Sequence, residues 1–393
     1  MHNIVILGGN LSGVPTAHYL LRHVLPHLNR ANSDKPQYTV TLISPSDHTF
    51  FKIGAPRAFL SADKSLYDKP FASIPSGFKN YDSSIFSFVQ GEAVKVDEAT
   101  KTVSVSLTKD TKTISVQYNT LVIATGTTSS SPLWTLHGDH QLSKDASADI
   151  LKLLPKAKTI LIAGGGAVGV ETTGEIAYNY GGKDVTILSG GTRLLPRLKH
   201  TGIAKSAEKQ LESLNVKIVH NIKVASSTRL PDGKASVKLS DGSTKTVDVF
   251  IDATGGKPNT GFLPASWLDG SKRVVTDTST LRATKAPAGV YSLGDVASFS
   301  KNSIMDAEWS VPALCYSIWS DLGGNSTKGN ALKEKKYKQM EADMQIVPIG
   351  PNGGVGVLFG WQIPSFLVKA LKSKTYFMEK APGKATGEDV LKA

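Results

Sequence analysis

The most informative stretch of the chain is Thr159-Ile-Leu-Ile-Ala163 followed by Gly164-Gly-Gly-Ala-Val-Gly169. The five residues before the glycines predict a buried strand, and the glycines fit the pattern G-x-G-x-x-G at the start of a helix. In this pattern Gly164 allows a tight turn, Gly166 lets a pyrophosphate approach the backbone, and Gly169 lets the helix pack on the strand. The stretch therefore predicts a Rossmann-type dinucleotide site at a helix N-terminus.

A less regular turn of the same kind opens the chain. Asn3-Ile-Val-Ile-Leu7 predicts a strand, and Gly8-Gly-Asn-Leu-Ser-Gly13 follows it with Asn10 in place of the second glycine. Asn tolerates positive φ better than most residues, so a close turn is still expected. We predict a second dinucleotide site here, which includes Gly9 and Ser12.

Both units also end in the same way. The strand Thr120–Ala124 leads into Thr125-Gly126, and the strand Thr246–Ile251 leads into Ala253-Thr-Gly255. Alternating strands and helices indicate an α/β fold with parallel sheets. We predict two Rossmann-like dinucleotide-binding domains in a glutathione-reductase-like arrangement, the second inserted in the first, plus a small C-terminal α+β region. The expected boundaries are 1–127 and 253–325 for the first domain, 128–252 for the inserted domain, and 326–393 for the C-terminal region.

Both units lack the acidic residue that usually binds ribose hydroxyls. Ser44 ends the second strand of the first unit and can make one such hydrogen bond. In the inserted unit, Ser189 ends the strand and Arg193 follows, which suits a 2′-phosphate, so NADPH should serve at least as well as NADH. Glu171 is expected to hydrogen-bond the nicotinamide ribose or carboxamide. Its alternative role is a favourable charge near the helix N-terminus.

Composition excludes several classes of protein. Apolar residues make up 40% and charged residues 20% of 393, as in ordinary globular proteins, and no stretch is apolar enough to span a bilayer. The single cysteine, Cys315, excludes a disulfide framework and a Cys-x-x-Cys pair. The net charge of +12 attracts any anionic partner. We expect no nucleic-acid partner and no metal site, since His137-Gly-Asp-His140 lies in a loop and His23 and His27 lack a third ligand.

Further segments carry a family resemblance. Gly289-Val-Tyr-Ser-Leu-Gly-Asp295 reads as a strand ending in Gly-Asp, and Phe51–Ala58 follows the second strand of the first unit. At these residues, and in the tail at 350–356 and 359–365, the chain resembles the fungal apoptosis-inducing-factor-2-like (ferroptosis-suppressor-type) FAD-dependent pyridine nucleotide oxidoreductases. These are relatives of the type II NADH:quinone reductases, and the resemblance spans nearly the whole chain.

The resemblance implies FAD in the first unit and NAD(P)H in the inserted one. Arg57 would contact the flavin cofactor, Ala93 would meet the adenine through its backbone, and Asp295 would hydrogen-bond the ribityl chain or a phosphate. Lys52 and Glu308 are the catalytic candidates, for tuning the flavin or contacting the acceptor, with a plain salt bridge as the alternative for each. Taken together, the other expected cofactor-binding residues are Gly8, Gly9, Asn10, Ser12, Gly13, Ser44, Thr125 and Gly126 for FAD, and Gly164, Gly166, Gly169, Glu171 and Arg193 for NAD(P)H.

The implied activity is hydride transfer from NAD(P)H to bound FAD and onward to a quinone or small organic acceptor. Quinone-reducing relatives often have Ala-Gln where this chain has Ala307-Glu308. Two alternatives therefore stay open: a flavoprotein tailoring enzyme that acts on a metabolite, and a redox-switched flavoprotein that binds DNA or a membrane.

The C-terminal region predicts an amphipathic helix. Apolar residues recur at helical spacing between Ile363 and Leu371, Pro364 suits the first turn, and Lys369, Lys372 and Lys374 lie nearby. Such a helix could make peripheral membrane contact through 361–376, or dock on the flavin domain. We expect a cytoplasmic protein that can associate with a lipid surface such as the outer face of the mitochondrion.

Overall fold

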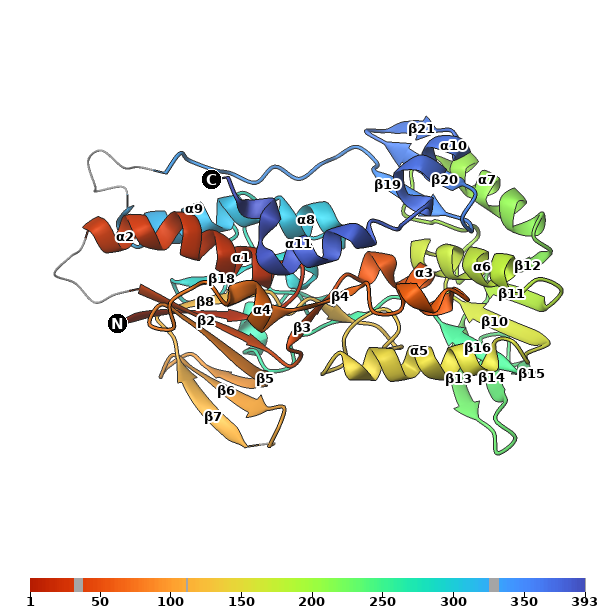
Figure 1. Cartoon of the computed structure of the whole chain (residues 1–393), viewed down its shortest axis with the longest axis horizontal. Helices are drawn as coiled ribbons and strands as arrows, with labels where there is room; N and C mark the ends of the chain where they lie inside the picture. Colours follow the sequence, from red (N-terminus) through yellow and green to blue (C-terminus); the bar gives the residue numbers. More distant parts are fainter. Residues whose placement is uncertain (32–37, 111, 325–331, 393) are drawn as a thin grey trace.

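The computed structural model describes residues 1–31, 38–110, 112–324 and 332–392. Figure 1 shows an elongated molecule, with one α/β unit at each end and the C-terminal region lying across both. The first unit has a sheet with the strand order β18-β8-β1-β2-β5-β6-β7. Its parallel strands are β1 (His2–Leu7), β2 (Tyr38–Ser44), β8 (Thr120–Ile123), β18 (Val290–Ser292) and the first part of β5 (Phe86–Asp97).

Strand β5 changes partner along its length. Its first residues pair in parallel with β2, and the residues from Gly91 onward pair antiparallel with β6 (Thr102–Leu107). Strand β7 (Thr113–Gln117) extends this antiparallel part. Strands β5 and β6 thus form a hairpin whose turn directly follows Asp97.

A long helical segment covers one face of the first sheet. It consists of α1 (Gly13–Tyr19), a π-helical turn η1 (Leu20–Val24) and α2 (Leu25–Ala31), and α9 (Val311–Asp321) packs against α1. A proline usually ends a helix, but Pro26 lies in the first turn of α2. The π turn before it already interrupts the regular i to i+4 bonds, so the missing N–H of proline costs little there. Residues 28–37 are mostly polar in sequence, yet α2 extends to Ala31, and 32–37 lie outside the described residues.

The region 61–84 is rich in Ser, Lys, Asp and Pro, a composition typical of irregular segments, but it contains regular structure. Strand β4 (Phe71–Ser73) pairs with β3 (His48–Phe50), and the short helix α4 (Ile74–Phe78) follows. Ser73 caps α4 by accepting a hydrogen bond from the Ser76 N–H. Helix α3 (Ala55–Leu60) lies between β3 and this region and packs against the inserted unit.

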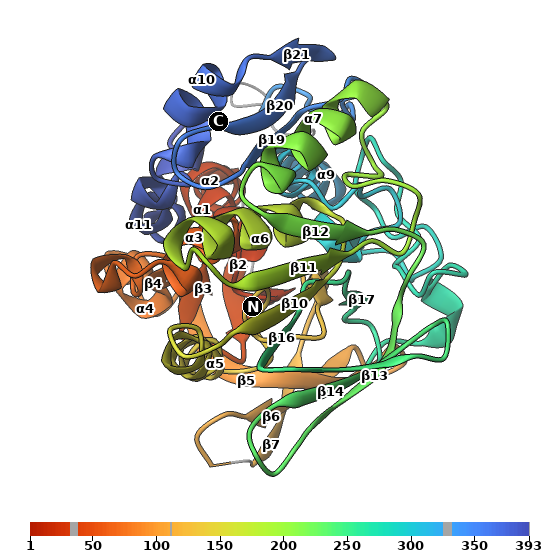
Figure 2. The same ribbon diagram turned by 90° about the vertical axis from the view of Figure 1, so that its right-hand side faces the viewer.

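The inserted unit has its own parallel sheet with the order β12-β11-β10-β16 (Figure 2). Its strands are β10 (Thr159–Ala163), β11 (Asp184–Leu188), β12 (Val216–Val219) and β16 (Val249–Asp252), and its helices are α5 (Gln141–Leu153), α6 (Ala167–Asn179) and α7 (Thr201–Glu212). A separate antiparallel sheet holds β13 (Val224–Arg229), β14 (Ala235–Leu239) and β15 (Thr244–Val247). The chain leaves and returns through β9 (Thr127–Thr128) and β17 (Lys257–Pro258), which pair with each other. Because β18 then pairs with β8, the second unit is inserted in the first, as predicted.

The C-terminal region connects the two units. Its antiparallel sheet of β19 (Gln345–Pro348), β20 (Gly354–Leu358) and β21 (Trp361–Ile363) packs on α6 and α7. The chain then runs through α10 (Ser365–Val368) and a π turn η7 (Lys369–Ser373) to α11 (Ala381–Thr386), which packs on α1 and α4 of the first unit. No helix within the described residues has the length and apolar character needed to cross a bilayer.

Candidate functional site

The first glycine turn joins β1 to α1 and leaves no room for side chains at two positions. Gly8 has φ +113°, and a Cβ there would lie 2.3 Å from the Ala124 carbonyl oxygen. A Cβ at Gly13 would lie 1.8 Å from the Gly8 oxygen. Only glycine therefore lets β1, β8 and α1 meet this closely, and the α1 N-terminus is left open to a phosphate.

Asn10 occupies the place of the second glycine without closing the turn. Its Oδ1 accepts a hydrogen bond of 3.1 Å from the Phe50 N–H, which turns the side chain toward β3. Ser44 is buried at the end of β2, and its side chain packs against Gly9, where a Cβ would lie 2.6 Å from that of Ser44. A serine here leaves a hydroxyl, but no carboxylate, beside the turn.

A cavity of about 710 Å³ extends from this turn along the carboxyl ends of β1 and β8. That volume falls within the range of cofactor sites, and the position is where α/β sheets bind ligands. Eight of the residues expected to bind FAD line it: Gly8, Gly9, Asn10, Ser12, Ser44, Thr125, Gly126 and Asp295. Gly13 does not line the cavity but packs against the Gly8 carbonyl within the turn.

Lys52 and Asp295 meet inside this cavity. The Lys52 Nζ lies 2.7 Å from Asp295 Oδ2, and Asp295 is buried while Lys52 is partly exposed. Asp295 lies in the turn after β18, where Gly294 has φ +75°. The pair places a fixed donor and a fixed acceptor beside the glycine turn.

Thr125 and Asn259 form the hinge between the units at the edge of the cavity. The Thr125 hydroxyl donates to the Asn259 carbonyl at 2.8 Å, and the Asn259 amide donates to the Thr125 carbonyl at 2.9 Å. The strand pair β9–β17 continues from this contact. The hinge thus orients the inserted unit against the cavity.

The second glycine turn repeats the geometry of the first. Gly164 has φ +120°, a Cβ there would lie 2.5 Å from the Ala253 oxygen, and a Cβ at Gly169 would lie 1.8 Å from the Gly164 oxygen. Gly166 differs, since an added Cβ would meet no described atom within 4 Å. That open space beside the α6 N-terminus is where a second dinucleotide phosphate can approach.

Glu171 is buried on α6 and paired with a residue of the C-terminal region. Lys372 Nζ lies 2.6 Å from Glu171 Oε1 and also donates to the Ile346 carbonyl at 3.0 Å. Burial raises the pKa of Glu171, although Lys372 opposes that shift. Lys372 itself lines the cavity, so this pair connects the inserted unit to the flavin side of the site.

Arg57 does not line the cavity. Its Nε and Nη2 donate to the Glu175 carboxylate at 2.6 and 2.7 Å, and the guanidinium lies 5.0 Å from the Tyr376 ring centre. Burial opposes the charge of Arg57, yet the hydrogen bonds and charge of Glu175 raise its pKa. The hydroxyl of Tyr376 also donates to Glu175. This buried cluster joins α3, α6 and the C-terminal region, and the predicted contact of Arg57 with the flavin finds no support in this arrangement.

Arg193 also differs from its expected placement. Its Nη2 donates to the carbonyls of Pro196 and Leu198, at 3.1 and 2.6 Å, and its Nη1 atom is buried. The guanidinium therefore holds its own loop and does not present a free surface to a 2′-phosphate. The side chain of Lys223, by contrast, lies over Gly190, directly after Ser189.

Two further candidates lie away from the cavity lining. Glu308 ends α8 (Ile304–Glu308) and pairs with buried Lys384 at 2.7 Å. Burial raises its pKa against the pull of Lys384. Ala93 lies in β5 beside an irregular register with β6. Glu308 thus matches its alternative role, a salt bridge.

Sequence reasoning missed the basic and aromatic partners supplied by the C-terminal region. Lys372, Tyr376 and Lys384 each meet an acidic residue more than 70 positions away. Glu175 is the partner that the sequence could have indicated, because it follows Glu171 by one helical turn and lies on the same face of the predicted helix.

Comparison with known proteins places this geometry in a family. The family model described as pyridine nucleotide-disulphide oxidoreductase matches residues 2–313. The chain belongs to this family. The family name refers to a disulphide, but this chain has a single cysteine, Cys315, which is buried. No dithiol pair within the chain can therefore relay electrons.

Curated relatives cover nearly the full chain. Oxidoreductase phnG of Penicillium herquei is 34% identical over 98% of this chain and 96% of its own length, and oxidoreductase ptaL of Pestalotiopsis fici is 33% identical over 98% and 99%. Ferroptosis suppressor protein 1 of Xenopus tropicalis is 23% identical over 96% and 94%. The resemblance to ferroptosis-suppressor-type proteins is thereby confirmed.

A solved structure shows the same fold. The water-forming NADH oxidase of Lactobacillus brevis, bound to NADH, superposes with a TM-score of 0.64 at 15% identity, over 91% of this chain and 75% of that protein. The protein is an FAD-dependent NAD(P)H oxidoreductase. The two glycine turns, which a Cβ would block, fit the two dinucleotides.

Proposed function

We propose that the protein passes electrons from NAD(P)H, through its FAD, to a quinone or another small organic acceptor. Bound flavin supplies the hydride chemistry, so the chain has mainly to bind and orient the reactants. The observation that carries the proposal is the mixed lining of the cavity. The glycine turn and the Lys52–Asp295 pair line it together with apolar side chains, among them Ile304, Met305, Met344, Leu358 and Phe377. Apolar side chains beside the flavin site suit a flat, hydrophobic acceptor.

Anaerobic mixing experiments test this directly. NADH or NADPH should bleach the yellow protein, and a short-chain quinone should restore its colour at a rate that rises with quinone concentration. Restoration no faster than in buffer alone would exclude quinones as acceptors. Testing candidate metabolites in the same assay would then address the tailoring-enzyme alternative.

The surface beside Leu358 supports peripheral membrane contact. Leu358 lines the cavity, and the chain turns next to it so that Phe359 and Trp361 are 62% and 79% exposed. Phe366, Leu367 and Leu371 extend the apolar surface. Exposed Lys369 and Lys374 flank it, as in helices that lie in an anionic lipid interface. A lipid-soluble quinone could pass from such an interface into the cavity.

The exposure of these apolar side chains argues against the alternative that they dock on the flavin domain. The side chains that pack inward are instead Val368, Ser373 and Tyr376, which are buried. Lys372 is not available to headgroups because it pairs with Glu171. Deleting 361–393 would remove this buried packing together with the surface, so point substitutions give the cleaner test.

Trp361→Ser combined with Phe366→Ser should abolish co-sedimentation with anionic liposomes and slow the reduction of a long-tailed quinone held in them. The rate with a water-soluble quinone should stay unchanged. Leu142→Ser is the matched control, since Leu142 is 48% exposed on α5, outside the apolar surface. Unchanged liposome binding by the double variant would refute the membrane contact and leave the oxidoreductase proposal intact.

A further inference from the structure

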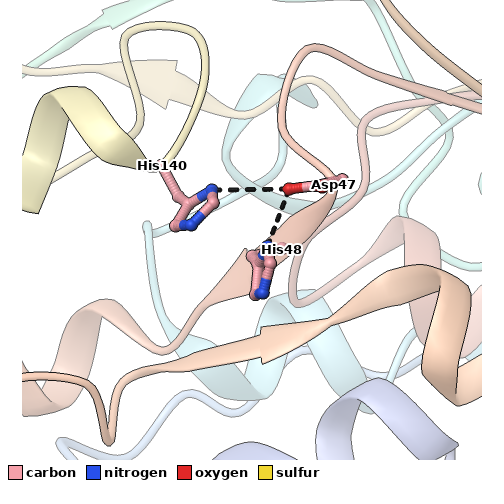
Figure 3. Close-up of side chains that lie close together, drawn as sticks. All are labelled: Asp47, His48 and His140. Carbon is pink, nitrogen blue, oxygen red and sulfur yellow. Dashed lines mark hydrogen bonds and ion pairs between the residues drawn. The ribbon is translucent and has the colours of Figure 1, made fainter.

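Three side chains from two distant parts of the sequence converge outside the flavin cavity. Asp47 and His48 follow β2, and His140 directly precedes α5. Figure 3 shows both imidazole rings turned toward the Asp47 carboxylate. Each residue offers one ligand atom, and the three atoms all lie within 4.8 Å of one another.

The spacing of these atoms resembles a partly collapsed metal site. Asp47 Oδ1 lies 2.7 Å from His48 Nδ1 and 3.4 Å from His140 Nδ1. Tetrahedral Zn²⁺ with bonds of about 2.0–2.1 Å places its ligand atoms about 3.4 Å apart. One separation already has this value, and the other needs His48 to move by less than an ångström.

A hydrogen-bonded cluster alone does not account for His140. The pair Asp47–His48 makes an ordinary hydrogen bond. His140 Nδ1, however, is buried and makes no hydrogen bond to any described atom, although buried polar atoms are rarely left without a partner. It points toward two carboxylates, with Asp47 at 3.4 Å and Asp139 at 3.2 Å. A cation between them would supply the missing partner.

The side chains around His140 suit a metal ion. The ring centre of His48 lies 4.0 Å from that of His140, and one ligand atom of each ring lies within 4.8 Å of the Asp47 carboxylate. Asp139 is already oriented, because its Oδ2 accepts from the Gln90 amide at 3.0 Å. Two imidazoles with one or two carboxylates suit Zn²⁺ and similar transition metals better than Mg²⁺ or Ca²⁺.

We propose that Asp47, His48 and His140 bind one divalent transition-metal ion of the Zn²⁺ type. The ion would join the loop after β2 to the N-terminal end of α5. Both attached segments line the flavin cavity, through Ser44 and Pro45 on one side and Leu136 on the other. Metal binding should therefore hold two walls of the FAD site together and slow the loss of FAD.

The test uses the flavin-loaded protein, freed of metal with a chelator and titrated with Zn²⁺ by calorimetry and with Co²⁺ by its visible absorption. One ion should bind per chain, and Zn²⁺ should slow FAD release on dilution at least twofold. His48→Ala and His140→Ala should each weaken binding by at least tenfold. His137→Ala is the matched control, since His137 is exposed in the same loop and outside the cluster.

The outcomes separate this site from the proposed activity. Absence of a stoichiometric Zn²⁺ or Co²⁺ signal in the wild-type protein overturns the proposal, even if a variant fails to fold. Equal weakening by His137→Ala overturns it as well. All of these readouts are independent of NAD(P)H oxidation and of the acceptor.

Discussion

Substituting Glu175 by Gln should strongly destabilise the protein, because it leaves Arg57 as an unpaired buried charge. The two side chains are 0% and 8% exposed and meet at 2.6 and 2.7 Å. Removing one partner of such a pair costs about 3–5 kcal/mol of unfolding free energy. Replacing both residues with Met removes both charges and leaves only the Tyr376 hydroxyl without its acceptor, at about 1–3 kcal/mol. The double variant should therefore be about 2 kcal/mol more stable than Glu175→Gln.

Urea unfolding followed by circular dichroism and by flavin fluorescence measures these differences. Lys152→Met serves as the control, because its pair with Asp149 is exposed and should contribute less than about 1 kcal/mol. A double variant no more stable than Glu175→Gln would contradict this prediction. The flavin content of folded Arg57→Met decides a second question: retention of FAD agrees with a purely interdomain role, whereas loss of FAD would support direct contact with the cofactor.

Three further predictions concern pH, cofactor choice and flavin binding. Burial lowers the pKa of His18 to about 4, below the ~6.5 of an unfolded chain. The contribution of neutral His18 to folding stability is therefore complete above pH 6.5 and is lost as pH falls toward 4. Urea unfolding should show a loss of unfolding free energy of up to about 3 kcal/mol over that range, and a smaller loss in His18→Gln. Lys223→Ser should raise KM for NADPH and leave that for NADH unchanged in steady-state assays; equal effects on both would exclude a role at the 2′-phosphate. Gly8→Ala should yield protein without FAD, because its Cβ would meet a backbone oxygen at 2.3 Å, whereas Gly166→Ala should keep the flavin absorbance.

Local sequence patterns predict the two sheets and their glycine turns well. The turn at Gly164 and the imperfect turn at Gly8 have the same strained glycine conformations, because the close contact between strand, helix and neighbouring strand dictates the residue type. The insertion of the second unit in the first was predicted from the strand followed by Thr-Gly that ends each unit. These features depend on residues that are neighbours in sequence, or on a periodicity that a short window contains.

Contacts between distant segments were beyond this reasoning. Arg57 resembles a flavin contact in its local motif, but its partner Glu175 lies on a helix of the other unit. Arg193 has the expected position in its loop, yet its Nη2 donates to carbonyls of that same loop. The cluster of Asp47 and His140 is likewise visible only after folding, because nothing in either segment indicates the other. The domain boundaries and the individual cofactor contacts remain predictions.

The pairing of β18 with β8 has a consequence for synthesis on the ribosome. The inserted unit is contiguous in sequence and can fold as soon as its last strand emerges. The first sheet must wait for Val290–Ser292, which follow β8 by roughly 170 residues, or about 10–30 s at typical translation rates. Until then the edge of β8 is unpaired, and Asp295 is missing from the FAD cavity. Flavin capture should therefore come late, after the nicotinamide-binding unit has formed.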